Sequence, residues 1–276
     1  MNFKELCQLI ELQPQVVENL DTLGKSFDIL PFAKHIGGLA DYAKSADAYA
    51  ALKEELGDDP LGMKILYCYL NAALITYEKY LELGIDKQIF VDTMKSFTRF
   101  IDETLEKQDE LAFVHAFWSY RHLNTSLLRV GTLEFEWRVR KGEKIISVHI
   151  PSNADLTDKS LDESFAAARK LFVEKFPEYA NAPITCESWM MWEGLNKLFG
   201  EGSRVLGFQG RFELMGQNPP SPNCLPFIFK RKDCSDYAKL PEKTSLQRNA
   251  KALLLAGGGI GSGFGVLKTD VKLLNN

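Results

Sequence analysis

The stretch LLRVGTLEFEWRVR, residues 127–140, marks the point where the pattern of the sequence changes. Before Val130, apolar residues recur at intervals of three and four, as they do on one face of a helix. From Leu133 to Arg140, apolar and charged residues alternate, which is the period of a β-strand with one buried face. We therefore predict a helical domain over residues 1–130 and a sheet-containing domain over residues 131–276.

The predicted helices of the first domain are separated by loop signals at Gly37-Gly38, Gly57 to Pro60 and Gly84. Between the last two signals, the residues from Leu61 to Leu83 predict one long helix. Asp86 is placed to cap the next helix, and a further helix is predicted from Leu111 to Leu128. This half of the chain is predicted to be all-helical.

The second domain is predicted to be a mixed sheet with helices. A turn at residues 140–143 joins two strands of a hairpin that ends at Ile150. Ser160 and Glu163 have the spacing of a capping box that opens a helix, and apolar runs predict strands at residues 184–189, 204–215 and 225–230. The predicted fold class is α+β: an all-helical N-terminal domain followed by a mixed-sheet α/β C-terminal domain.

The stretch TSLQRNAKALLLAGGGIGSGFGVLK, residues 244–268, predicts a capped helix, a glycine-rich turn and a closing strand. Thr244 and Gln247 have capping-box spacing, and the unpaired amides at such a helix start, with Arg248 nearby, favour an anionic ligand. The glycines follow the helix, where partial negative charge disfavours anions. We therefore interpret them as a helix C-cap, with a nest or lid as the alternative.

Composition excludes several classes of partner. The chain has 276 residues, a formal net charge of −4 and a pI near 5.7, so we expect no binding to nucleic acid or to anionic membranes. Five scattered cysteines lack metal-ligand spacing, which predicts reduced thiols and no metal site. The N-terminus lacks the pattern of a secretion signal, and no apolar run is long enough to span a bilayer, so we expect a cytoplasmic protein.

Several phrases together resemble a family of bacterial acyltransferase domain-containing proteins. They are LLRVGTLEFEWRV, VHIP, ESW, GFQGRFEL and TSLQR. The run from Gly131 to Glu136 is similar to the family's Gly-Arg-Leu-Gln-Phe-Glu, with Thr132 and Glu134 replacing Arg and Gln, and His149-Ile150-Pro151 keeps its place. The resemblance implies a helical N-acyltransferase N-terminal domain, a GNAT-like C-terminal domain and acetyl-CoA or another acyl-CoA as cofactor. It also implies a small-molecule amine as acceptor, and it leaves open a homo-oligomer.

The resemblance also implies a cofactor site. In ordinary GNAT enzymes a strand leads into a Q/R-x-x-G-x-G/A turn whose amides hold the pyrophosphate of acetyl-CoA. Gln247, Ala250 and Ala252 fall in that register, with alanine at the first glycine. The residues expected to bind the cofactor are Thr244, Ser245, Gln247 and Arg248. The sequence ends a few residues after the last predicted strand, so we expect the proton-handling group of a full GNAT domain to be replaced from elsewhere.

Two residues have side chains suited to deprotonating an amine. His149 ends a strand before a proline and has a near-neutral reference pKa; the alternative is a cap of the turn. Glu187 could serve as base through a water molecule; the alternative is a solvated carboxylate.

For substrate binding we select Arg211 and Trp189, with a cross-strand ion pair and simple packing as the respective alternatives. The function predicted is N-acyl transfer, and the competing hypothesis is a noncatalytic module that binds a small ligand or a protein partner.

Overall fold

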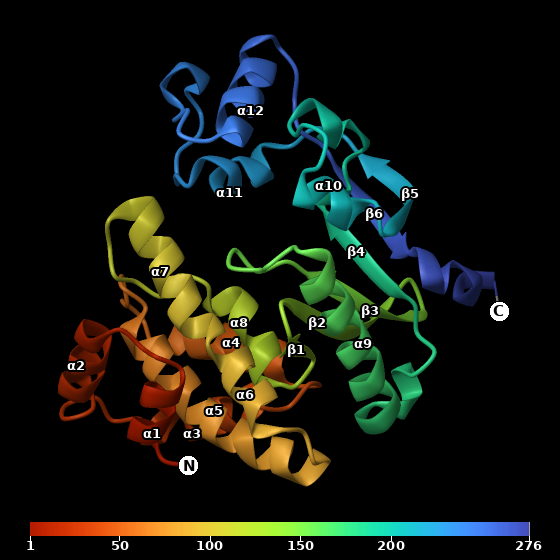
Figure 1. The fold of residues 1–276 in the computed structure, drawn as a ribbon. Helices are drawn as coiled ribbons and strands as arrows, with labels where there is room; N and C mark the ends of the chain where they lie inside the picture. Colours follow the sequence, from red (N-terminus) through yellow and green to blue (C-terminus); the bar gives the residue numbers. More distant parts are fainter. Residues whose placement is uncertain (276) are drawn as a thin grey trace. The chain divides into compact units, whose positions relative to one another are not determined.

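In the computed structural model, which describes residues 1–275, the chain divides into two compact units, residues 1–130 and residues from Gly131 onward (Figure 1). The first unit is helical. Its helices are α1 (Phe3–Leu9), α2 (Pro14–Leu23), α3 (Ala33–Leu39), α4 (Ser45–Glu55), α5 (Met63–Leu83), α6 (Lys87–Met94), α7 (Ser96–Gln108) and α8 (Ala116–Leu123). The short 3-10 helix η1 (Leu30–Phe32) and the strand β1 (Leu127–Val130) complete the unit.

Helix α5 is the centre of this unit and contacts α1, α2, α3, α6 and α8. Its fully buried Tyr69 packs edge-on against Phe97 and Phe113, with ring centroids 6.3 and 5.9 Å away. The Tyr69 hydroxyl donates to the Ala116 carbonyl oxygen at 2.9 Å, so the buried polar group is satisfied. The aromatic residues of α5 thus hold the helical core together.

Two predicted helices of this unit differ from the structure. The cap at Asp86 is confirmed, since its carboxylate accepts from the Gln88 amide at 2.6 Å. The apolar stripe that follows is shared between α6 and α7. The helix predicted over residues 111–128 is only α8, because Thr125 adopts a left-handed conformation (φ 64°) and the chain then enters β1.

Within the second unit the strands of the sheet lie in the order β2-β3-β4-β6-β5. Its strands are β2 (Leu133–Arg140), β3 (Glu143–His149), β4 (Ile184–Ser188), β5 (Phe212–Asn218) and β6 (Ser262–Leu267). Strands β3 and β4 are parallel, whereas β2/β3, β4/β6 and β5/β6 are antiparallel. The predicted mixed sheet is confirmed.

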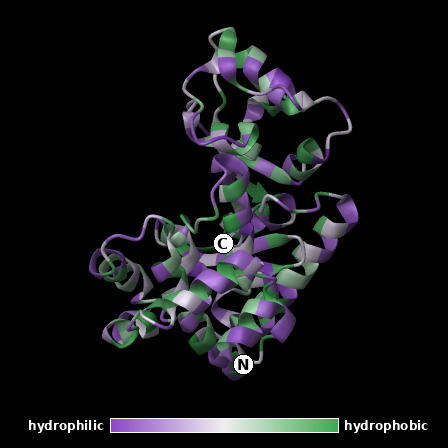
Figure 2. Ribbon diagram, turned by 90° about the vertical axis from the view of Figure 1, so that its left-hand side faces the viewer, coloured by the Kyte–Doolittle hydropathy of each residue, from purple (hydrophilic) through white to green (hydrophobic). Residues whose placement is uncertain are grey.

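The helices of this unit are α9 (Asp158–Lys175), α10 (Arg204–Gln209), α11 (Leu225–Phe229) and α12 (Ser245–Leu255). The 3-10 helices are η2 (Pro177–Tyr179), η3 (Trp189–Met191), η4 (Glu193–Lys197), η5 (Pro222–Cys224), η6 (Tyr237–Lys239) and η7 (Lys268–Asn275). Figure 2 shows hydrophilic and hydrophobic residues alternating along the helices, as expected where one face of a helix is buried.

Three local predictions for this unit are wrong. Residues 204–209 form α10 because the Ser203 hydroxyl caps a helix there, so only the second part of the predicted strand is β5. Residues 225–229 form α11, since a short apolar run fits a buried helix as well as a strand. Helix α9 has Thr157 as its N-cap, and the Ser160 hydroxyl instead donates to the Asp155 carboxylate at 2.6 Å.

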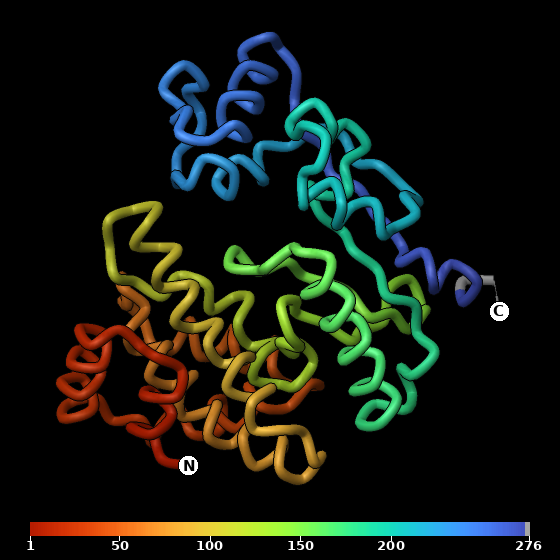
Figure 3. Tube along the Cα trace, viewed as in Figure 1, coloured from red at the N-terminus to blue at the C-terminus, as the bar shows by residue number. Residues whose placement is uncertain are grey.

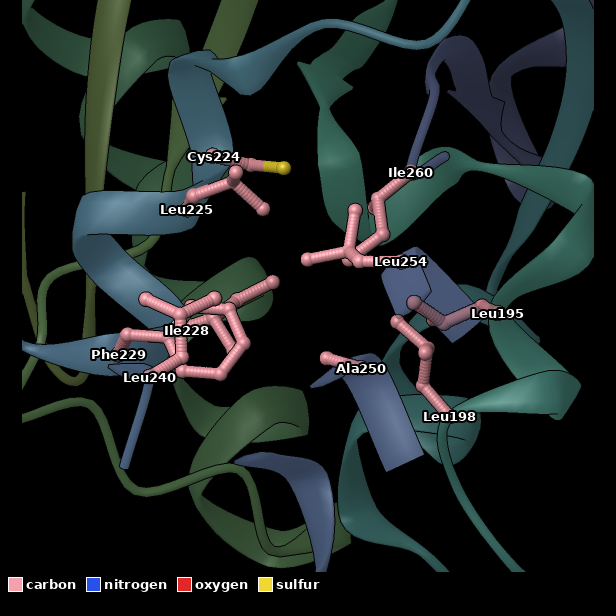
Figure 4. Close-up of a cluster of buried hydrophobic side chains, with 10 residues drawn as sticks. All are labelled: Leu195, Leu198, Cys224, Leu225, Ile228, Phe229, Leu240, Ala250, Leu254 and Ile260. Carbon is pink, nitrogen blue, oxygen red and sulfur yellow. The ribbon is translucent and has the colours of Figure 1, made fainter. Parts of the chain in front are cut away.

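A second hydrophobic cluster lies around α11 and α12, apart from the sheet (Figure 4). Its buried members are Leu195, Leu198, Cys224, Leu225, Ile228, Phe229, Leu240, Ala250, Leu254 and Ile260. The capping box predicted for α12 is confirmed: Thr244 accepts from the Gln247 amide, and the Gln247 side chain accepts from the amide of Thr244. The helix is therefore fixed to this cluster at its start.

The predicted glycine-rich turn and strand are also present. Gly257 (φ 79°) follows the end of α12, where a left-handed residue commonly ends a helix. Farther on, Gly263 allows η3 to lie on β6, because a Cβ atom there would be 2.2 Å from the Met191 carbonyl oxygen. Across residues 1–275, we find no helix with the length and apolar character needed to cross a membrane.

Candidate functional site

The parallel strands β3 and β4 are joined by the crossover helix α9, which can be followed in Figure 3. Val148 pairs with Cys186, so both strands end at the same edge of the sheet. Ligands of α/β sheets bind outside the carboxyl ends of parallel strands. At this edge the chain also passes from β3 through residues 150–157 into α9, whose first amides lack partners within the helix.

One face of the sheet at this edge is polar. Strand pairing places Glu134 opposite His149 and Glu136 opposite Ser147, and Ser147 lies beside Thr185 of β4. Paired residues project from the same face, so these five side chains share one side of the sheet. The opposite side carries the apolar residues, as when Phe135 packs against Phe165 of α9 with a centroid distance of 6.0 Å.

His149 and Glu136 form a hydrogen-bonded pair on the polar face. The distance from His149 Nε2 to Glu136 Oε2 is 2.9 Å, and the Glu136 side chain is 8% exposed compared with 22% for His149. A buried carboxylate that accepts the Nε2 proton sets the tautomer, so the lone pair of the neutral ring is on Nδ1.

Glu187 lies on the same polar face at the end of β4, and it pairs with Phe264 of β6. Its carboxylate contacts the Arg140 guanidinium at 3.4 Å, and that guanidinium lies 4.2 Å from the centre of the Phe264 ring. The Glu187 side chain is 41% exposed, as the solvated alternative anticipated. His149 and Glu187 thus lie on the same face and at the same edge of the sheet. The partner of His149 is Glu136, and the partner of Glu187 is Arg140.

The loop between β3 and α9 is held by Asp155. Its backbone amide donates to Thr132 Oγ1 at 2.5 Å, and its carboxylate accepts from Ser160 Oγ and from the Thr157 amide and hydroxyl. Hydrogen bonds from Ser160, and then from Thr157, lower the pKa of Asp155. The start of α9 is therefore fixed in place beside the end of β3.

Arg211 lies between α10 and β5 rather than within a strand. Its guanidinium donates to the carboxylate of Asp158 at 2.9 Å and also to that of Asp162, both in the first turns of α9. These contacts connect the start of β5 to α9. Arg211 therefore forms an ion pair, as in the alternative to substrate binding, but its partners lie on a helix and not on a neighbouring strand.

The four residues predicted to bind the cofactor lie at the start of α12, away from the β3/β4 edge (Figure 1). Gln247 is 4% exposed; its Oε1 accepts from the Lys243 amide at 2.8 Å and its Nε2 donates to the Ile228 carbonyl oxygen at 3.2 Å. Arg248 donates to the Glu242 carbonyl oxygen, and Ser245 is exposed. A loop containing η6, and not a strand, leads into this helix.

Trp189 lies in η3, directly after β4. Its ring stacks on Phe199 with a centroid distance of 6.4 Å and packs against the cluster around α11 and α12. The structure thus separates the predicted residues into three groups: His149 and Glu187 at the sheet edge, Arg211 at α9, and the α12 residues with Trp189 around the second cluster.

The sequence reasoning missed Glu136 as a partner of His149. Glu134 and Glu136 alternate with buried Leu133 and Phe135, yet both glutamates are themselves buried. From the alternation alone, both glutamates were predicted to face solvent. The signal that could have found the pair is the hairpin register, which brings Glu136 next to His149 on the same face.

Comparison with protein families gives two matches. The GNAT-like C-terminal domain matches residues 91–267, and the N-acyltransferase N-terminal domain matches residues 1–125. The comparison with curated proteins gave no significant match.

Solved structures with the same fold include an acyltransferase in complex with decanoyl-CoA and teicoplanin (21% identity, TM-score 0.77, covering 96% of this chain and 86% of that one). A second is an acyltransferase in complex with CoA and 10C-teicoplanin (21%, TM-score 0.78, 96% and 87%). A third is an acyltransferase in complex with decanoyl-CoA (19%, TM-score 0.78, 96% and 86%).

Proposed function

The chain belongs to the family of GNAT-like C-terminal domains, and from this we propose that it is an N-acyltransferase that moves an acyl group from acyl-CoA to an amine. The match of residues 1–125 to the N-acyltransferase N-terminal domain supports the proposal. So do the structures of the same fold that hold CoA or decanoyl-CoA. The observation that carries it is the His149–Glu136 pair at the carboxyl end of the parallel strands β3 and β4.

In the proposed reaction His149 is the general base. Its Nδ1 accepts a proton as the amine nitrogen attacks the thioester carbonyl, the C–S bond breaks, and CoA leaves as the thiolate. Glu136 keeps the ring in the required tautomer and orientation through its hydrogen bond to Nε2. Glu187, on the same face, is the second candidate base, and its ion pair with Arg140 fixes its direction.

We propose direct transfer without an acyl-enzyme. Cys186 lies next to Glu187, but it is fully buried and its burial raises the pKa of the thiol, so the reactive thiolate is disfavoured. A nucleophilic cysteine requires the opposite environment, with a lowered pKa and access to the substrate.

For acyl-CoA we propose the start of α9 as the phosphate-binding element. Here the loop of residues 150–157 carries the chain from the end of β3 into the helix, and the first-turn amides carry partial positive charge. The nearby carboxylates already have partners: Asp155 lies 3.9 Å from Arg204 and Asp158 lies 2.9 Å from Arg211. The Gln247 side chain is buried and occupied by hydrogen bonds to the backbone, so we assign the start of α12 a structural role. Binding of the cofactor by Thr244, Ser245 and Arg248 remains a prediction to be tested.

The test is CoA release from decanoyl-CoA, measured with a thiol reagent in the presence of a panel of amines that includes teicoplanin. We expect His149→Gln to lower kcat/KM by about 10²- to 10³-fold and Glu136→Gln by about 10-fold, with the Kd for acyl-CoA nearly unchanged in calorimetry. Glu178→Gln is the matched control, since Glu178 pairs with Lys144 at the opposite end of β3.

Two outcomes would contradict the proposal. If neither CoA nor acyl-CoA binds, the chain is the noncatalytic module of the competing hypothesis. If CoA binds, and its affinity falls about tenfold or more in Arg248→Ala but not in variants at the start of α9, the cofactor site is at α12.

We place the reaction in the cytoplasm, which suits the free cysteines of residues 1–275.

A further inference from the structure

The helical unit contains a cavity that is lined by none of the residues proposed for acyl transfer. It has a volume of about 390 Å³ and is lined by α4, by the loop between α4 and α5, and by residues 113–117. This volume is in the range of small-molecule sites in proteins. All of its lining residues belong to the first unit.

The walls of the cavity are mostly apolar and aromatic. Leu56, Ile65 and Phe113 are buried, whereas Val114 and Phe117 are 44% and 54% exposed. Large apolar side chains left open beside a cavity favour an apolar ligand that would remove them from water. Tyr49 supplies a further ring, which is fixed by stacking on Tyr120 with a centroid distance of 5.8 Å. Flat rings on several sides favour an aromatic body.

Of the charged groups around the cavity, one cation has no partner among residues 1–275. Both carboxylate oxygens of Asp59 are used, because they accept from the Lys64 and Ile65 amides at 3.1 and 3.0 Å and so cap the start of α5. Lys64 is also occupied, since its ammonium donates to the Leu56 and Asp58 carbonyl oxygens. Lys53 is exposed and makes no ion pair among residues 1–275. Its ammonium is therefore the charge in this cavity that is available to a ligand.

The cavity is held open by its backbone. Gly62 adopts a left-handed conformation (φ 67°), and a Cβ atom at this position would lie 2.1 Å from the Phe113 carbonyl oxygen. The Phe113 amide donates to the Leu61 carbonyl oxygen at 2.8 Å, which fixes the 113–117 segment against the loop. A ligand would therefore enter a largely preformed site with little ordering of the chain.

We propose that this cavity binds a small aromatic monocarboxylate, with the carboxylate at Lys53 and the ring between Tyr49, Phe113 and Phe117. The Lys53 ammonium repels a protonated amine placed beside it, so this site differs in its chemistry from that of the acyl acceptor. The inference does not rest on acyl transfer, because every lining residue lies in the helical unit.

The probe for the experiment is 2-naphthoate, titrated into the full-length chain by calorimetry without acyl-CoA; the neutral 2-naphthamide tests the role of charge. We expect saturable binding of 2-naphthoate that is weakened at least fivefold by Lys53→Gln and retained in Lys53→Arg. Binding of 2-naphthamide should be correspondingly weak. Lys34→Gln is the matched control, because Lys34 is an exposed lysine of the same unit outside the cavity.

A second pair of variants tests the location. Val114→Trp fills the cavity from an exposed position and should abolish binding, whereas Leu81→Trp, at a 53% exposed residue of α5 that does not line the cavity, should leave it unchanged. Circular dichroism checks that each variant is folded. The proposal is overturned if 2-naphthoate does not bind, if Lys53→Gln binds equally well, or if Val114→Trp still binds. His149→Gln should bind 2-naphthoate normally, so failure of the transferase proposal would be recognised separately.

Discussion

Replacing Gly263 by alanine should destabilise the sheet unit far more than the same change at Gly216, although both glycines lie in neighbouring strands. A Cβ atom at Gly263 would lie 2.2 Å from the Met191 carbonyl oxygen and 2.6 Å from Gln217 Nε2, whereas ordinary contact begins at 3.4 Å. At Gly216 the added atom meets nothing within 4 Å. The two substitutions are therefore chemically identical but differ in the space available.

The clash at Gly263 is with backbone, which cannot rotate away. The Met191 carbonyl oxygen also accepts a hydrogen bond from Gln217 Nε2 at 3.0 Å, and the Gln217 Oε1 atom accepts from the Glu193 amide at 2.9 Å. Moving η3 would strain both bonds, so we expect a loss of about 2–3 kcal/mol, the upper part of the range for overpacking. Gly216→Ala should instead be neutral or stabilise by up to about 1 kcal/mol, through the unfolded state.

Urea unfolding followed by tryptophan fluorescence measures the difference, because Trp189 and Trp192 flank Met191 in sequence. With a urea m-value of about 2–3 kcal/mol/M, we expect the midpoint for Gly263→Ala to fall by about 1 M and that for Gly216→Ala to stay the same or rise by up to about 0.5 M. Equal midpoints for the two variants would refute the packing of η3 on β6 described above.

The remaining predictions concern single polar or titratable groups. Asp270→Ala should lower stability by about 2–3 kcal/mol in thermal or urea unfolding, because its carboxylate accepts from the buried Ile184 amide at 2.9 Å and pairs with an arginine of α9; a change below about 0.5 kcal/mol would contradict this. Of the cysteines, Cys234 should react first with a thiol reagent in the native protein and Cys186 only on unfolding, because full burial raises the pKa of the latter; mass spectrometry of the labelled sites checks the order. Burial lowers the pKa of His115, so the unfolded chain binds more protons than the folded one and the free energy of unfolding should fall as the pH drops below about 6.5. His115→Phe should reduce the dependence of this free energy on pH, and an unchanged dependence would exclude the residue as its source.

Several elements could be predicted because their signals are local. The hairpin of β2 and β3 follows from the alternation of residues 133–140 and the turn after it, and the start of α12 follows from the spacing of Thr244 and Gln247. The long α5 follows from its apolar period between two glycine signals. Each of these depends on hydrogen bonds and side chains within a few residues of one another.

Other elements could not be predicted because their signals are ambiguous. The apolar run at residues 225–229 fits a strand or a buried helix, and only its packing in the cluster around α11 and α12 makes it a helix. From the sequence, the phosphate-binding helix was predicted to start near Gln247, because that residue falls in the register of the Q/R-x-x-G-x-G/A turn. Which helix starts beside the ends of two parallel strands, as α9 does for β3 and β4, depends on how the sheet is connected.

The sequence by itself determined the two-part architecture, the period of each half and the presence of His149 at the end of a strand, because these follow from residue type and local spacing. Only the tertiary structure decided which side chains meet. Pairing between β2 and β3 places Glu136 beside His149, and the crossover through α9 brings the ends of β3 and β4 to one edge. Strand register and the choice of face are set by contacts between residues distant in the chain, and a one-residue shift would separate the pair.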